Sequence, residues 1–358
     1  MCHPIYSIVN NIILGHGTDP TPLAGLGLGA LTVGITGLSI GICFAFGAAT
    51  FMSQEFGRGN FRSLEVYKNR SLFLNAIVFT ILFIPSLFIM EIYEAIGQSK
   101  EVSIYAAQYV HTVMPFMSFE LANWSYQQFL SSQKIMLPSM LGMAVGAAFH
   151  AIIVSILYFG CDLGFTAICW ATASVFVGRF LCTQCFIWGL KDLKWHDDVH
   201  MFSKESVSNL WPLVQVCLGS MFMGIWGWWA FEILTFMAQY LGETEAAAQS
   251  IMRSLGLLTF MLPVGYSSAS GILTGNAMGA AKPNVAMTYY ATCMFAAMFI
   301  TVLQMGILWL GQDAFIRMYT NQPDIAALMI HAWPVLLIFT LFDTTQAMAM
   351  SVVRASGK

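Results

Sequence analysis

Long apolar segments follow one another along almost the whole chain, and they restrict it to folds that lie in a membrane. A helix needs about 20 mostly apolar residues to cross the ~30 Å hydrocarbon core of a bilayer. Charged residues make up only 9% of the 358, against about 25% in an ordinary soluble domain, so most of the outer surface must face lipid. Nine segments are long enough: 23–46, 72–95, 103–131, 136–160, 163–189, 209–240, 246–274, 285–311 and 324–350.

Residues 4–15 resemble the end of an earlier span, so this segment is numbered helix 1 and the others helices 2 to 10. Loops after odd-numbered helices hold two basic residues, Lys100 and Arg317. Loops after even-numbered helices hold eleven: Arg58, Arg62, Lys68, Arg70, Lys134, Lys191, Lys194, Lys204, Lys282, Arg354 and Lys358. Because positive charge gathers in cytoplasmic loops, the even-numbered loops are predicted to be cytoplasmic.

Related sequence features recur about 220 residues apart, which predicts an internal repeat. The matched pairs are 54–57 with 276–279, 100–102 with 323–325, His111 with His331, and Pro115 with Pro334. Helix 7 begins the second copy, so one copy has six helices and both copies cross the membrane in the same direction. The alternative is that apolar helices resemble one another by composition alone.

The repeat divides the chain into two predicted bundles. Residues 1–190 form an N-terminal lobe with a partial helix 1 and helices 2 to 6. A polar cytoplasmic linker, 191–208, leads to a C-terminal lobe at 209–358 with helices 7 to 10. The second lobe then lacks its last two helices, so about ten of twelve are present. Small-residue seams for close helix contact are expected at Gly37 with Gly41 and at Gly142 with Gly146.

Several classes of function find no support in the sequence. We see no phosphate-binding Gly-rich loop ending in Lys-Ser/Thr and no catalytic Ser/His/Asp, paired-carboxylate or zinc pattern, so we expect neither an enzyme nor a metal site. The net charge of −3 is too small to argue for nucleic acid as a partner.

Ionisable side chains within spans are the candidates for function, because a charge near the centre of a membrane helix costs roughly 2.5–3.5 kcal/mol on insertion scales. Glu232 lies deep in helix 7, after Trp228 and Trp229. The carboxylate could exchange a proton, and the two indoles could form a flat surface for an organic cation. Alternatively, Glu232 is held by a hydrogen bond between helices.

Two other helices carry polar stripes with a spacing of three or four residues, which places the side chains on one face. In helix 10 the stripe consists of Thr340, Asp343 and Gln346. The stripe of helix 4 consists of Glu120, Asn123 and Gln127, and it could be either a second wall of a polar cavity or a packing seam. Arg179 in helix 6 is a further charge in a span and needs a partner.

Motifs distributed over the chain resemble the multidrug and toxic compound extrusion (MATE) transporters, especially their eukaryotic branch. The most specific is Trp228-Trp229-Ala230-Phe231-Glu232, followed by Gln249-Ser250-Ile251. Further matching stretches are 15–16, 53–57, 69–71, 96–98, 261–267, 275–280, 341–343 and 353–357. The resemblance implies two six-helix lobes around a V-shaped cavity that opens alternately to each side. It also implies that Glu232 and Asp343 stand where the family carries carboxylates that are important for transport.

Residues and resemblance together predict a proton-coupled antiporter that exports organic cations or other xenobiotics. Glu232, Asp343 and Glu120 are the predicted proton- or cation-binding residues. The predicted substrate cavity is lined by Trp228, Trp229, Gln249, Thr340, Gln346, Asn123 and Gln127. An ion gradient, H⁺ rather than Na⁺, replaces any cofactor. We expect a monomer in the plasma membrane or in a vacuolar or other internal membrane. The alternatives are a lipid-linked saccharide flippase of the same superfamily and a non-transporting membrane scaffold or fragment.

Overall fold

The computed structural model describes residues 3–15, 21–189, 199–239, 241–320 and 322–357, and every regular element in these ranges is helical. The elements are α1 His3–Gly15, α2 Thr21–Thr32, the π-helix η1 Val33–Ser39, α3 Ile40–Arg58, α4 Phe61–Ser86, α5 Ile89–Ala95, α6 Lys100–Val113, the 3₁₀ turn η2 Met114–Phe116, α7 Met117–Ser132, α8 Leu137–Val154, the π-helix η3 Ser155–Gly160, α9 Phe165–Gly189, α10 Lys204–Val207, α11 Trp211–Gln239, α12 Glu243–Gly279, α13 Pro283–Leu310, α14 Gln312–Tyr319 and α15 Pro323–Ala355.

The helices form two compact units. The first comprises Met1–Met52 and Asn60–Met221, and the second comprises Ser53–Gly59 and Phe222–Lys358. Helices α3 and α11 pass from one unit to the other without a break. The predicted lobes, 1–190 and 209–358, differ from this division because the end of α3 packs with the second unit and the start of α11 packs with the first.

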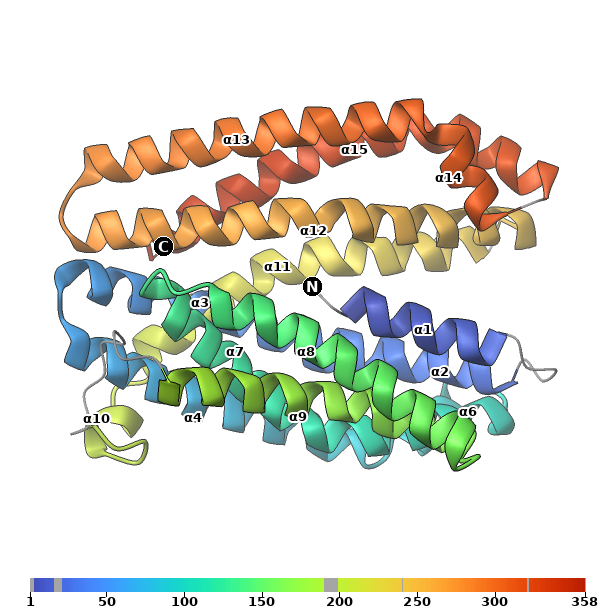
Figure 1. Cartoon of the computed structure of the whole chain (residues 1–358), viewed down its shortest axis with the longest axis horizontal. Coiled ribbons are helices and arrows are strands. Elements are labelled where there is room, and N and C mark those ends of the chain that lie inside the picture. Colours follow the sequence, from blue (N-terminus) through green and yellow to red (C-terminus); the bar gives the residue numbers. More distant parts are fainter. Residues whose placement is uncertain (1–2, 16–20, 190–198, 240, 321, 358) are drawn as a thin grey trace. The chain divides into compact units, whose positions relative to one another are not determined.

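Each unit has its own core. In the first, α2 packs on α6, α8 packs on α9, and α7 lies against α4 and α9. In the second, α12, α13 and α15 run side by side (Figure 1), and Trp333, Met329 and Leu255 are buried among them. Many large apolar side chains remain exposed, for example Phe295 and Leu310. Such a surface is stable in lipid rather than in water.

Seven helical segments of the described residues are long and apolar enough to cross a membrane. The predicted span 209–240 forms α11, of which 211–227 is a shorter apolar stretch. The span predicted at 103–131 is interrupted by η2 at Met114–Phe116, which divides it between α6 and α7. This interruption contains Pro115, which cannot donate a backbone hydrogen bond. Helices α12 and α15 continue through Pro263 and Pro334.

The predicted loop between the spans 23–46 and 72–95 is also wrong. Helix α3 continues to Arg58 and α4 begins at Phe61, with Asn60 as its N-cap. Arg62, Lys68 and Arg70 therefore belong to α4 rather than to a loop. A hydropathy window detects only the part of a helix that suits hydrocarbon, so it misses turns with charged residues.

Two equivalent hydrogen bonds support the internal repeat and correct its register. His111 Nε2 donates to the backbone oxygen of Ser86 at 3.1 Å, and Trp333 Nε1 donates to that of Leu308 at 3.1 Å. Each bond spans 25 residues, and 333 follows 111 by the same 222 positions by which 308 follows 86. Trp333, not His331, is therefore the counterpart of His111. The same shift relates the first residues of α4 and α13, Phe61 and Pro283.

Three of the four glycines in the two predicted seams, Gly37, Gly41 and Gly146, lie in close helix contacts, whereas Gly142 has room for a Cβ. A Cβ on Gly37 or Gly41 would collide with side chains of α7, among them Met117 and Leu121. A Cβ on Gly146 would collide with the stem of Arg179, and Gly142 faces the same helix, α9. Gly146 thus allows α8 to pack directly on the aliphatic stem of Arg179.

Candidate functional site

A buried ion pair joins α7 and α9 in the first unit. Arg179 Nη1 donates to Glu120 Oε1, and both side chains are almost completely inaccessible to solvent. One turn further along, Thr183 Oγ1 donates to Asn123 Oδ1 at 2.8 Å, also in the interior. Glu120 and Asn123 are three residues apart on α7, and Arg179 and Thr183 are four apart on α9. Each spacing is about one helical turn, so the two polar bonds lie one above the other along the same helix contact.

This arrangement favours the packing seam over the cavity wall for the helix 4 stripe. Glu120 and Asn123 point at a neighbouring helix of their own unit and are 0% exposed. The charge of Glu120 is balanced by Arg179, which leaves no net charge to attract a cation. The buried Gln127 Nε2 has no hydrogen-bond partner among the described residues. The assignment of Glu120 to proton or cation binding stays a prediction, and the ion pair counts against it.

Among the described residues, Asp343 in α15 is not paired as Glu120 is. Its carboxylate is half-buried, and it makes no hydrogen bond or ion pair with any residue that the structure describes. Thr340 is buried and donates to the backbone oxygen of Leu336 at 2.8 Å, whereas Gln346 is exposed. The predicted polar stripe therefore turns from the core of the unit towards its surface, with Asp343 between the two environments.

The remaining predicted site residues lie on α11 and α12. Trp229 is exposed, and Gln249 is half-exposed near the start of α12. The side chains of Trp228 and Glu232 lie outside the described part of the structure, so the roles assigned to these two residues stay predictions.

A second buried ion pair was missed by sequence reasoning. Lys68 bonds to Glu65 one turn earlier in α4, and both are almost fully buried. The ammonium group lies 5.6 Å from the ring centre of Tyr126 and 5.2 Å from that of Phe129, both on α7. Aromatic faces stabilise a desolvated cation. The i,i+3 spacing of opposite charges in the sequence is the signal that could have revealed the pair.

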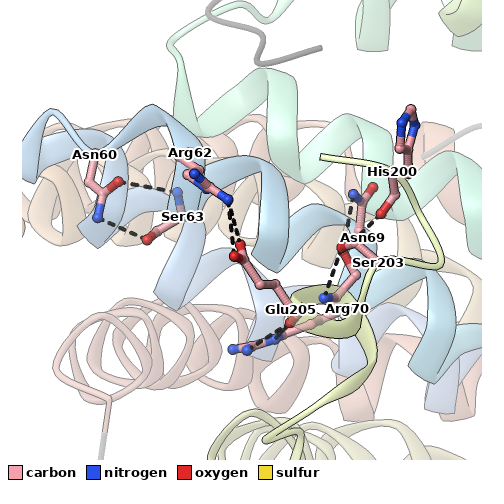
Figure 2. A network of polar contacts seen from close by, with 9 residues as sticks. Asn60, Arg62, Ser63, Asn69, Arg70, His200, Ser203 and Glu205 are labelled. Atoms are coloured by element: carbon pink, nitrogen blue, oxygen red, sulfur yellow. Dashed lines mark hydrogen bonds and ion pairs between the residues drawn. The ribbon is translucent and has the colours of Figure 1, made fainter. Parts of the chain in front are cut away.

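Polar contacts also dock the segment before α11 onto α4 (Figure 2). Arg62 binds both carboxylate oxygens of Glu205, at 3.0 and 3.2 Å, and Arg70 donates to the backbone oxygen of Glu205. The buried Asn69 donates to the backbone oxygen of Val199 at 3.2 Å and to the hydroxyl of Ser206 at 3.4 Å. This part of the predicted linker is thus fixed to the first unit.

Fold and site together define a multi-pass α-helical membrane protein whose spans carry both paired and unpaired ionisable groups. The family model described as MatE matches residues 1–157 and 220–358. The chain belongs to the MatE family. The predicted family and fold class, an all-α multi-pass membrane protein, are thereby confirmed.

Relatives and solved structures agree with this assignment. Mouse multidrug and toxin extrusion protein 2 is 28% identical over 99% of this chain and 61% of its own length, and human multidrug and toxin extrusion protein 1 is 25% identical over 99% and 61%. The chain therefore spans about three fifths of these relatives. The eukaryotic MATE transporter AtDTX14 superposes with a TM-score of 0.90 at 18% identity, over 99% of this chain and 79% of AtDTX14. An outward-facing multidrug resistance MATE transporter gives 0.88 at 18%, over 99% and 79%.

Proposed function

We propose that the protein is a secondary active transporter that exports organic cations or other xenobiotics in exchange for protons. The observation that carries the proposal is the half-buried carboxyl group of Asp343, which has no partner among the described residues. An ionisable group inside a membrane helix usually faces a cavity or a translocation pathway, because lipid contact is costly. The names of the relatives, multidrug and toxin extrusion proteins, support the substrate class.

A single carboxyl group can couple proton movement in one direction to substrate movement in the other. When it is ionised it attracts a cation, and when it is protonated it releases the cation, so proton and substrate compete for one place. Moving one elementary charge across 100 mV is worth about 2.3 kcal/mol, so an ion gradient can drive export without ATP. Glu232 is the second carboxyl group in this proposal, and Trp229 and Gln249 are proposed to line the cavity for the substrate.

The test is export of the cationic dye ethidium from vesicles that contain the protein, driven by an imposed pH gradient. Asp343→Asn keeps the size of the side chain but removes the titratable group, and we expect export to fall at least tenfold. Glu232→Gln should act similarly. Asp324→Asn is the matched control, because Asp324 is exposed at the start of the same helix and should not affect export.

Undiminished export by both Asp343→Asn and Glu232→Gln would remove the two carboxylates from the mechanism. Export that follows an imposed Na⁺ gradient and ignores the pH gradient would replace the proton by sodium. Absence of any dye movement with the unmodified protein would contradict the proposal as a whole.

A further inference from the structure

The end of α3 and the end of α12 fit together in the second unit through two glycines. Gly57 lies against the backbone carbonyl of Asn276, and Gly279 lies against the backbone carbonyl of Gln54. In both places an added Cβ would collide with backbone atoms, which cannot move aside as a flexible side chain can. The contact therefore depends on the absence of a side chain on each helix.

The contact is reciprocal in the register of the repeat. Gly279 follows Gly57 by the same 222 positions by which Asn276 follows Gln54. In each helix the glycine therefore packs on the backbone carbonyl of the equivalent residue in the other helix. Such self-complementary contacts are characteristic of a two-fold axis. Ser53 and Gly275 are also equivalent by this shift, and they touch each other. Two equivalent residues can touch only where they lie beside the local axis that relates them.

The crossing is closed and anchored. Ser53 is 1% exposed and Asn276 is buried. Gln54 Nε2 donates to the backbone oxygen of Ala355, at the end of α15, at 2.8 Å. Backbone packed directly on backbone leaves no passage for an organic cation at this point.

We infer that this glycine crossing, formed by 53–57 of α3 and 275–279 of α12, is a gate that closes the transport pathway at the even-numbered loops and parts once in every cycle. The inference rests on the proposed transport function. In transporters built from repeats, the substrate site lies at the repeat interface and access alternates by rocking of one repeat against the other. The crossing joins equivalent residues of the two copies, which is the kind of contact that such rocking would part. At Gly57 and Gly279 the contact is made by backbone rather than by interlocking side chains of these two residues.

The first experiment locks the crossing with a disulfide. A Cβ on Gly275 would lie 3.0 Å from the Cβ of Ser53, and an ordinary disulfide needs about 3.5–4.5 Å, so Ser53→Cys/Gly275→Cys can be oxidised once the two helices move apart by about 0.5 Å. The exposed Cys161 and Cys185 are replaced by Ser beforehand. We expect oxidation to reduce ethidium export at least tenfold and dithiothreitol to restore it.

The matched control joins α12 to α15 within one repeat. Ser270 and Ser351 are buried with their hydroxyl oxygens 3.2 Å apart, and Ser270 lies one to two turns before Gly275. Oxidised Ser270→Cys/Ser351→Cys should continue to export. If cross-linked Ser53→Cys/Gly275→Cys exports as fast as its reduced form, the crossing is a fixed pivot and the inference is wrong.

A second measurement needs neither the Gly275 substitution nor transport. Ser53→Cys adds little bulk, and its thiol can react with a membrane-impermeant maleimide only if the crossing opens. We expect labelling to accelerate at least tenfold when pH and ethidium gradients are imposed, while Ser270→Cys stays protected. Absence of labelling under every condition would contradict the gate. Labelling without ethidium export by the unmodified protein would instead contradict the proposed function and leave the opening established.

Discussion

Trp333 donates its indole hydrogen to the backbone oxygen of Leu308, 3.1 Å away in the last turn of α13. The final carbonyl groups of a helix lack partners within the helix, so this bond satisfies one of them. His111 does the same for Ser86 at the end of α4. In both repeats, an aromatic ring nitrogen thus donates a hydrogen bond to a backbone carbonyl at the end of the preceding long helix.

Trp333→Phe should destabilise the protein by about 1–3 kcal/mol, because Trp333 is fully buried and the carbonyl of Leu308 would lose its partner in the interior. His111→Phe should cost less, about 1 kcal/mol or below, because the side chain of His111 is exposed and loses less packing than that of the buried Trp333. The measurement is the midpoint of thermal unfolding in detergent, followed by size-exclusion chromatography. Equal shifts of the unfolding midpoint for the two variants would contradict the expectation that the buried bond of Trp333 contributes more stability than that of His111.

The Glu120–Arg179 pair gives a non-additive prediction. Arg179→Met leaves a buried carboxylate without its cation and should cost about 3–5 kcal/mol. The double variant Glu120→Leu/Arg179→Met removes both charges, so it should recover most of that loss. Thermal unfolding of the single and double variants measures the coupling. A double variant that is less stable than Arg179→Met would contradict the interpretation of the pair as a structural contact between α7 and α9.

Docking of the segment before α11 should depend on Asn69 more than on Arg62. Asn69 is buried and bonds to Val199 and Ser206, whereas the Arg62–Glu205 ion pair is more than half exposed on both sides (59% and 56%) and is worth about 0–1 kcal/mol. Trypsin cleavage after Lys204 reports undocking. We expect cleavage to accelerate about fivefold or more in Asn69→Leu and less than about twofold in Arg62→Met. The reverse order would place the docking energy in the ion pair.

The membrane fold could be predicted because hydrocarbon thickness imposes a length and a composition on every span. The Glu120–Arg179 pair could not. Glu120 and Arg179 are 59 residues apart on different helices, and no local pattern encodes which faces of α7 and α9 meet. A stripe of polar residues has the same sequence pattern whether it faces a cavity or a neighbouring helix. The sequence of α7 alone therefore does not distinguish a cavity wall from a packing seam.

The repeat was predictable in outline but not in register. The stretches 54–57 and 276–279 were matched correctly, since close backbone contact requires the glycine that ends each of them. The aromatic position was matched incorrectly to His331, because residue identity in the sequence suggested a histidine. In the structure, the feature that the two repeats share is a ring nitrogen bonded to the end of a helix, and Trp333 supplies it as His111 does.

Exchange of protons for organic cations is the central claim, and the internal pH of reconstituted vesicles tests it most directly. Vesicles that contain the protein and a trapped pH-sensitive dye start without a pH gradient, and an organic cation, tetraethylammonium, is added outside. The account predicts that the vesicle interior becomes alkaline as protons leave in exchange for the cation, and that Asp343→Asn abolishes the change. Uptake of radiolabelled tetraethylammonium without a change in internal pH would contradict proton exchange.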